Sequence, residues 1–126
     1  MVEQLTVGTR TAGETVVLTF AGELDVTNAG QAEEAVRAAQ AEHQWDSLVF
    51  DLSGLTFMDS TGVRVLVRAH RLAAQRGGTI ALAGLTPSVS RIMEVTGLDR
   101  AFAIHATLGE ALPAHSLSNG DDRRSG

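Results

Sequence analysis

The stretch LVFDLSGLTFMDSTGVRVLVRAHRLAAQ, residues 48–75, joins an apolar strand and loop to an amphipathic helix. Ser60 lies at the junction, where the apolar run ends and the helical pattern begins. At about 100° per residue, the side chains of that helix separate into two stripes. The sequence therefore predicts an exposed hydroxyl at a helix N-terminus. The apolar stripe, which we predict to face inward, contains Val63, Leu66, Val67, His70 and Ala74; the polar stripe contains Arg64, Arg68, Arg71 and Gln75.

Ser60 is open to two interpretations. Serine, threonine and aspartate are the preferred helix caps, so its position alone favours a capping role. Unpaired N–H groups and the positive end of the helix dipole also suit a negative group, such as a phosphate. The neighbouring residues favour this second role, because Gly62 leaves the first turn unshielded and Phe57 and Met58 add apolar surface beside the hydroxyl. A kinase could reach such a hydroxyl easily.

A second apolar group lies on the same helix, away from the predicted inward stripe. It consists of Val65, Ala69 and Leu72. Either a neighbouring helix covers these residues, or they contact another protein, and the sequence leaves both alternatives open. In the second case they form an apolar docking patch bordered by Arg64 and Arg68.

Length and composition narrow the class of protein. The chain has 126 residues, which suits one domain over residues 1–113 followed by a flexible polar tail over 114–126. It has no cysteine and no long apolar segment, so we expect a soluble, unexported protein of the reducing cytoplasm. The net charge is −5, and the ten basic residues are all arginines. Except for those in the polar stripe, these arginines are scattered along the chain. We therefore expect no nucleic-acid or membrane partner.

Hydrophobic periodicity and turn residues predict an α/β fold. From the second strand onward strands and helices alternate, which implies mostly parallel pairing with right-handed crossovers, and the amino-terminal hairpin adds an antiparallel edge. The predicted strands are 5–9, 15–20, 47–52, 79–83 and 102–105. The predicted helices are 27–42, the Ser60 helix up to Gly77 and Gly78, 87–96 between Thr86 and Gly97, and a short one through Leu112. In the first helix the residues predicted to face inward are Ala29, Ala32, Val36 and Ala39. The last helix is predicted to have a Thr107–Glu110 capping box.

Candidate chemical sites are few. Asp25, Asp51 and Asp59 lie at or near predicted strand ends and could be near each other, but no histidine stands at helical spacing to them. A nucleophile elbow requires glycine two residues before the serine, and Met58 occupies that place. The chain has no lysine and hence no P-loop. We predict no catalytic residue, no metal and no cofactor.

Two of the histidines have a predicted structural position, and the other two have no identifiable partner. His70 lies on the predicted inward stripe, so we expect a packed, hydrogen-bonded core residue. His43 is expected in solvent at a helix end, and His105 and His115 have no identifiable partner.

From about Leu5 to Leu112 the chain resembles the STAS domain family, and within it the bacterial anti-sigma factor antagonists. The resemblance implies a mixed sheet of about five strands with about four helices, an amino-terminal hairpin and then alternating strand and helix. The motifs that carry it are Gly22-Glu23-Leu24-Asp25, Asp51-Leu52-Ser53, Asp59-Ser60-Thr61-Gly62, Thr96-Gly97-Leu98-Asp99 and Glu110-Ala111-Leu112.

The resemblance also implies a function. Ser60 would be the phosphoacceptor of an anti-sigma factor that is also a serine kinase using ATP and magnesium, and a metal-dependent serine phosphatase would reverse the modification. The unphosphorylated protein would capture the anti-sigma factor and so free a sigma factor, acting as a non-enzymatic monomer or weak dimer. The implied partner-binding residues are Glu23, Asp25, Asp59, Thr61, Gly62, Val63 and Arg64.

Two other functions remain open from the sequence. One is a STAS scaffold subunit of a signalling or lipid-transport complex that is never phosphorylated, in which Ser60 only caps its helix. The other is a small hydrolase, which has little support because the elbow pattern fails.

Overall fold

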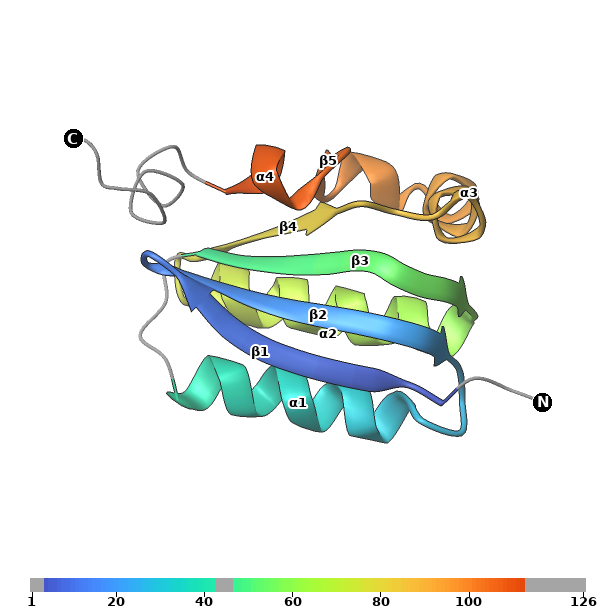
Figure 1. Cartoon of the computed structure of the whole chain (residues 1–126), viewed down its shortest axis with the longest axis horizontal. Coiled ribbons are helices and arrows are strands. Elements are labelled where there is room, and N and C mark those ends of the chain that lie inside the picture. Colours follow the sequence, from blue (N-terminus) through green and yellow to red (C-terminus); the bar gives the residue numbers. More distant parts are fainter. Residues whose placement is uncertain (1–3, 43–46, 113–126) are drawn as a thin grey trace.

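A computed structural model describes residues 4–42 and 47–112, and Figure 1 shows how these residues are arranged. They form one mixed sheet of five strands in the spatial order β1-β2-β3-β4-β5. The strands are β1 (Thr6–Ala12), β2 (Thr15–Leu24), β3 (Ser47–Met58), β4 (Thr79–Ala83) and β5 (Ala103–His105). The helices are α1 (Ala29–Glu42), α2 (Ser60–Gln75), α3 (Pro87–Thr96), the 3-10 turn η1 (Leu98–Arg100) and α4 (Leu108–Ala111).

Strand pairing confirms the predicted hairpin and the parallel sheet. β1 pairs antiparallel with β2 through the turn at Gly13, whereas β2–β3, β3–β4 and β4–β5 are parallel. The predicted strand 79–83 matches β4, and β5 begins one residue later than predicted. The fold class predicted from the sequence is therefore confirmed. The expected tail and His43 lie outside the described residues, so the domain boundary at residue 113 remains a prediction.

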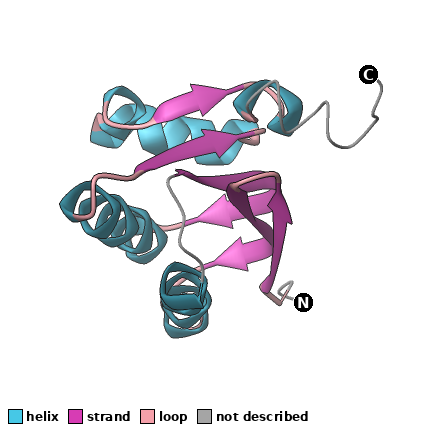
Figure 2. Cartoon of the chain, turned by 90° about the vertical axis from the view of Figure 1, so that its left-hand side faces the viewer, coloured by secondary structure: helices cyan, strands magenta, loops and turns pink. Residues whose placement is uncertain are grey.

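The sheet is covered on both faces, which explains its continuous apolar strands. α1 and α2 lie side by side on one face, as Figure 2 shows, and Leu48 and Phe50 point into the core that they cover. Val17 and Val49 point to the opposite face, where α4 covers them. Because successive strand residues point to opposite faces, β3 is apolar at every position of the Leu48–Phe50 run.

The first helix packs as its sequence predicts, but it begins later. The four predicted inward residues of α1 are all buried, and Ala32 has no exposed surface. The helix begins at Ala29 instead of Thr27, because the side chains of Asp25 and Asn28 bond to the backbone and hold the preceding residues in a turn.

The predicted inward stripe of α2 is fully buried only at Leu66, although Val63 packs against the core and His70 packs against Phe102. The helix buries Gly62, Val65, Leu66, Ala69 and Ala73. Val63, Val67 and His70 are only half-buried, and Ala74 is exposed. The reason is the position of α1, which packs along the α2 flank that carries Val65 and Ala69. Of the two alternatives for that flank, a neighbouring helix is the correct one for these two residues, and Leu72 remains half-buried.

β3 is longer than its apolar run predicts. The expected strand ends at Leu52, but β3 continues through the expected loop to Met58 and stays paired with β2. Two shifts of register, before and after the Ala21–Gly22 step, accommodate the extra residues. This extension carries the start of α2 to the same edge of the sheet as the end of β2.

The starts and ends of the helices largely follow the predicted signals. Gly77 and Gly97 have φ values of 76° and 78°, the left-handed conformation expected after α2 and α3. Thr86 precedes Pro87 as predicted, although its hydroxyl donates to the carbonyl oxygen of Leu55 at 2.7 Å and caps nothing. The predicted capping box is half formed: the Thr107 hydroxyl accepts from the N–H of Glu110, whose carboxylate accepts from Ala106 and not from Thr107. None of the helices in the described residues has the length and apolar character needed to cross a membrane.

Candidate functional site

The start of α2 lies at the carboxyl edge of β2 and β3. Leu24 pairs with Met58 at the end of the two strands, and the N–H of Asp59 donates to the carbonyl oxygen of Leu24 at 3.2 Å. The residues that follow the two strands, Asp25 and Asp59, are therefore brought to one edge. We call this edge, defined by Glu23, Asp25, Val26, Phe57, Asp59 and Ser60, the Ser60 edge.

Asp51 does not belong to the Ser60 edge, so the three aspartates expected to be near each other are not all brought together. Asp51 lies inside β3, where it pairs with Thr19 and Ala83 on the neighbouring strands. Its carboxylate accepts hydrogen bonds from the N–H and hydroxyl of Ser53 at 3.1 and 2.8 Å. No group of three or more acidic or histidine side chains that could hold a metal occurs in the described part of the chain.

Asp59, and not Ser60, caps α2. One carboxylate oxygen of Asp59 accepts from the N–H groups of Thr61 at 2.9 Å and Gly62 at 3.2 Å, and the backbone of Asp59 is extended. Ser60 is the first residue of the helix, and its side chain is exposed. Within residues 4–42 and 47–112 its hydroxyl makes no hydrogen bond. The capping interpretation of Ser60 is therefore wrong, and its hydroxyl is left free at the helix start.

Gly62 is a packing residue and not an opening in the first turn. It is buried, and a Cβ at this position would overlap Cγ of Met58 and come within 2.9 Å of Cγ of Leu24. Only glycine lets α2 begin so close to the ends of both strands. Met58 is also buried, with 4% of its surface exposed, so it adds no surface beside Ser60. The expectation for Phe57 is confirmed, because 44% of it is exposed.

The turn after β2 is held by its own side chains. The carboxylate of Asp25 accepts from the hydroxyl of Thr27 at 2.5 Å and from its N–H at 2.9 Å, and these bonds hold the pKa of Asp25 below its usual value. The amide of Asn28 accepts from the N–H of Asp25 and donates to the carbonyl oxygen of Glu23. The turn presents Val26, which is 71% exposed. Sequence analysis missed Val26, Thr27 and Asn28, although an apolar residue inside an Asp-x-Thr-Asn turn is a usable signal.

Gly22 lets β2 approach the chain that precedes β1. Its φ is +101°, and a Cβ there would overlap the carbonyl oxygen of Gln4. The carbonyl oxygen of Gly22 accepts from the hydroxyl of Thr56 at 3.1 Å. These contacts fix the irregular end of β2, which sets the position of the half-buried Glu23 and of the turn beyond it.

The Ser60 edge combines the exposed Ser60 residue with negative charge and exposed apolar surface. Glu23, Asp25 and Asp59 supply three carboxylates, while Val26 and Phe57 supply the apolar area. The remaining predicted contact residues lie on the first turns of α2: Thr61 and Val63 are half-buried, and Arg64 is exposed. This combination suits recognition of another protein.

No described histidine forms a hydrogen bond to Ser60. His70 lies further along α2, where its ring meets the edge of Phe102 with centroids 4.9 Å apart. It is packed as predicted, but it is half-buried and has no hydrogen bond within the described residues. The described histidines therefore supply no partner that could act as a general base on Ser60.

Known proteins resemble this chain in sequence and in fold. The Anti-sigma F factor antagonist of Paenibacillus polymyxa is 32% identical over 94 residues, which cover 71% of this chain and 77% of that protein. The structure of an anti-sigma factor antagonist from Mycobacterium paratuberculosis superposes with a TM-score of 0.79 at 28% identity, covering 86% of this chain and 91% of that one.

A further structural match, described as the Bacillus cell fate determinant SpoIIAA in the phosphorylated form, has a TM-score of 0.65 at 26% identity and covers 86% of this chain and 96% of that one. The family model described as the STAS domain matches residues 6–111. Together with the five-stranded mixed sheet and the Ser60 edge, this match shows that the chain belongs to the STAS domain family.

Proposed function

We propose that this protein is an anti-sigma factor antagonist whose binding is switched by phosphorylation of Ser60. The observation that carries the proposal is the exposed Ser60 hydroxyl, which does not cap α2 because Asp59 does so. The names of the relatives and the phosphorylated form of SpoIIAA support it. We place this function in the cytoplasm, where sigma factors and ATP are found.

In the unphosphorylated state, the Ser60 edge binds an anti-sigma factor that has serine kinase activity. Val26 and Phe57 supply apolar area at the interface, and Glu23 and Asp25 attract a basic surface of the partner. Thr61, Val63 and Arg64 extend the contact along α2, whereas the buried Gly62 acts by positioning the helix. Binding removes the anti-sigma factor from its sigma factor.

The same partner then modifies the surface that it binds. The Ser60 hydroxyl oxygen attacks the γ-phosphorus of ATP held with magnesium by the kinase, the bond to the β-phosphate oxygen breaks, and ADP leaves. The hydroxyl proton passes to a base of the kinase. A serine phosphatase later hydrolyses the phosphoserine, which restores the hydroxyl and the binding state.

The phosphate changes the interface more than the fold. It adds about −1.5 to −2 charges at pH 7. The Asp59 carboxylate already occupies the N–H groups of Thr61 and Gly62, so the phosphate stays outward in solvent, where the helix dipole still favours it. A partner that covers Ser60 would have to bury this anion beside three carboxylates. Moving a partner from bound to free needs about 5.5 kcal/mol of differential affinity, and a buried, unmatched dianion supplies energy on that scale.

The proposal is tested with the cognate kinase, ATP and magnesium. The parent protein and Thr61→Ala should each gain one phosphate, whereas Ser60→Ala should gain none and should still bind the kinase. Intact-mass spectrometry and calorimetry measure the two results. Equal phosphorylation of Ser60→Ala would overturn the assignment. Unchanged binding by the phosphorylated protein and by Ser60→Asp would favour the scaffold function instead.

A further inference from the structure

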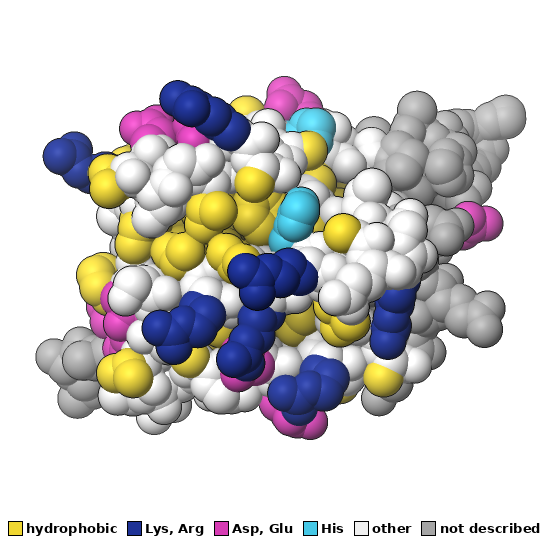
Figure 3. All heavy atoms as spheres, turned by 180° about the vertical axis from the view of Figure 1, so that it is seen from behind, with side chains coloured by type: hydrophobic (Ala, Val, Ile, Leu, Met, Phe, Trp, Pro, Cys, Tyr) yellow, Lys and Arg dark blue, Asp and Glu magenta, His cyan; other side chains and the backbone are white. Residues whose placement is uncertain are grey.

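α2, the helix that begins at Ser60, carries positive charge along its length, whereas the Ser60 edge is negatively charged. α2 contains Arg64, Arg68 and Arg71 and no acidic residue, and Arg76 follows as its C-cap. The whole chain has a net charge of −5, so the positive charge of this helix is segregated from an acidic remainder. Figure 3 shows arginine side chains gathered across this face of the molecule.

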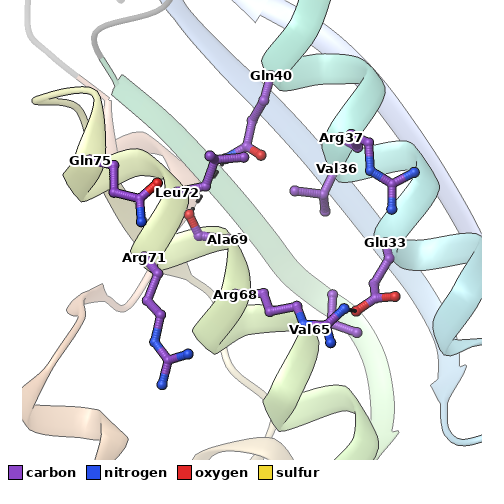
Figure 4. Close-up of a pocket in the computed structure, with 10 residues that line it drawn as sticks. All are labelled: Glu33, Val36, Arg37, Gln40, Val65, Arg68, Ala69, Arg71, Leu72 and Gln75. Carbon is purple, nitrogen blue, oxygen red and sulfur yellow. Dashed lines mark hydrogen bonds and ion pairs between the residues drawn. The ribbon is translucent and has the colours of Figure 1, made fainter.

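A groove lies between α1 and α2, on the flank of the arginine stripe. It is an open groove of about 300 Å³, and its apolar lining consists of the buried Val36, Val65 and Ala69 and the half-buried Leu72. Figure 4 shows these side chains between the two helices. Such a volume is at the lower end for a ligand site and suits one or two inserted side chains. We call this the α1–α2 groove.

Apolar packing between α1 and α2 holds the groove in shape, and two polar contacts bridge the helices across it. Arg68 forms an ion pair with Glu33 at 2.9 Å, and the side-chain amide of Gln40 donates to the carbonyl oxygen of Ala69 at 3.5 Å. Figure 4 marks both contacts, one toward each end of the groove. The site is therefore formed before any partner arrives, which lowers the entropic cost of binding.

The rim of the groove has excess positive charge. Its lining includes three arginines, Arg37, Arg68 and Arg71, and the carboxylate of Glu33, while the adjacent Glu34 supplies a second carboxylate, so one positive charge is in excess. Arg68 is paired with Glu33, and Arg37 is paired with Glu34 on an exposed turn of α1. Arg71 is exposed and forms no ion pair within the described chain. An arginine held beside an apolar cavity without a counter-charge suits a carboxylate on an incoming segment.

We propose that the α1–α2 groove is a second docking surface, which binds an acidic segment of a partner protein through one inserted apolar side chain flanked by carboxylates. The apolar side chain enters the groove beside the half-buried Leu72, and the carboxylates contact Arg71 and Arg37. At 1.5 Å per residue the lining residues Val65 and Leu72 lie about 7.5 and 18 Å along the helix from Ser60, so the groove begins beyond the first turn of α2. The proposal does not depend on phosphorylation of Ser60.

Charge distinguishes this occupant from two others. Residues 113–126 carry Asp121 and Asp122, but Arg123 and Arg124 cancel their charge, so this segment offers no net complement to the rim. A second copy of the chain would bring the same arginines to the interface. A foreign acidic segment is the occupant that the arginine-rich rim favours.

The test titrates full-length, nitrogen-15-labelled protein with two synthetic peptides of about 12 residues, each with a central phenylalanine. Glutamates flank the phenylalanine in one peptide, and lysines replace them in the other. We expect only the acidic peptide to shift the amide signals of Val36, Val65, Ala69 and Leu72. The affinity should fall at least fivefold in Arg37→Gln/Arg71→Gln and should also fall with added salt. Arg91→Gln, which removes an exposed arginine of α3, is the matched control and should bind as the parent does.

Several results would overturn the proposal. These are the absence of shifts, shifts outside the groove, equal binding of the two peptides, or an unchanged affinity in the double variant. Sedimentation of the peptide-free protein supplies a further check, because a dimer that Arg37→Gln/Arg71→Gln strengthens would identify a second copy as the occupant.

Discussion

The Ser60 edge and the α1–α2 groove share one helix but differ in charge and in construction. The edge is acidic; contacts between near neighbours, such as Asp59 with Thr61 and Asp25 with Thr27, hold its cap and its turn, and the pairing of β2 with β3 brings the two together. The groove is basic and is formed by two helices that are separated in sequence, with the ion pair between Arg68 and Glu33 across it. One helix can therefore present two surfaces of opposite charge, because its first turn and its flank are built by different parts of the chain.

Replacing Gly22 should cause the largest loss of stability at the Ser60 edge. Gly22→Ala would place a Cβ on the carbonyl oxygen of Gln4 at a φ of +101°. We expect a loss of about 3 kcal/mol in the free energy of unfolding, from strain and overlap together. Gly77→Ala separates the two causes, since Gly77 has a φ of +76° but no atom within 4 Å of its Cβ position. Urea unfolding measures both, and equal losses would show that the overlap with Gln4 costs nothing.

Replacing Gly62 should disturb the edge less and at a different point. The Cβ of Gly62→Ala would meet Met58 and Leu24, whose side chains can shift slightly, so we expect a loss of about 2 kcal/mol and a weaker interaction with the partner. Gly30→Ala in α1 is the matched helical control, because nothing lies within 4 Å of its Cβ position. That control should be neutral or stabilise by up to about 1 kcal/mol. Thermal unfolding that ranks the two variants the other way would contradict the packing role of Gly62.

Replacing Asp59, the N-cap of α2, should destabilise the Ser60 edge without changing the α1–α2 groove. Asp59→Ala leaves the N–H groups of Thr61 and Gly62 without their acceptor, and we expect a loss of about 1 kcal/mol. Asp59→Asn keeps an oxygen acceptor and should retain most of the stability. Hydrogen exchange at the first turn of α2 should rise in the alanine variant alone. Faster exchange at Val36 as well would mean that edge and groove are not independent.

The turn at Asp25 makes stability depend on pH. Hydrogen bonds from Thr27 and Asn28 hold the pKa of Asp25 below the usual value of 3.8. A depressed pKa in the folded state gives stability that is present above 3.8 and is lost as pH falls through the folded value. Thr27→Val should move the pKa of Asp25 back toward its usual value and flatten the acid side of the stability curve. NMR titration of the carboxyl carbon tests this, and an unchanged pKa would remove Thr27 as the cause.

The smallest effect is expected at the groove. Arg68 and Glu33 form an ion pair whose side chains are 64% and 27% exposed, so its coupling energy should be about 0.5 kcal/mol. A double-mutant cycle of Arg68→Ala and Glu33→Ala measures this value. A coupling above about 2 kcal/mol would show that the ion pair, and not apolar packing, holds the two helices together.

Much of this molecule could be predicted from local patterns. The strand 79–83, the inward residues of α1 and the glycines that end α2 and α3 depend on alternation, helical spacing and φ preference, all of which are readable within a few residues. The junction of the apolar run and the amphipathic helix identified Ser60, and the family resemblance added its role and the acidic contact residues around it. The roles of these residues as phosphoacceptor and partner contacts remain proposals.

The buried face of α2 could not be predicted in the same way. This helix has apolar residues on two flanks, and its periodicity is satisfied by burying either one. The prediction from sequence considered only Ser60 as the cap, although the adjacent Asp59 is also a good capping residue. Only the length of β3 and the hydrogen bond from Asp59 to Leu24 place the aspartate at the N-cap position.

The sequence by itself thus determined the order and type of the elements and the presence of a serine at the start of α2, because these depend on interactions between residues close in the chain. The tertiary structure alone decided that the Ser60 hydroxyl is free, that Gly62 is a packing residue and that α1 leaves a basic groove beside α2. Those features depend on which surfaces meet when distant segments pack, and a helix with two apolar flanks does not specify that choice.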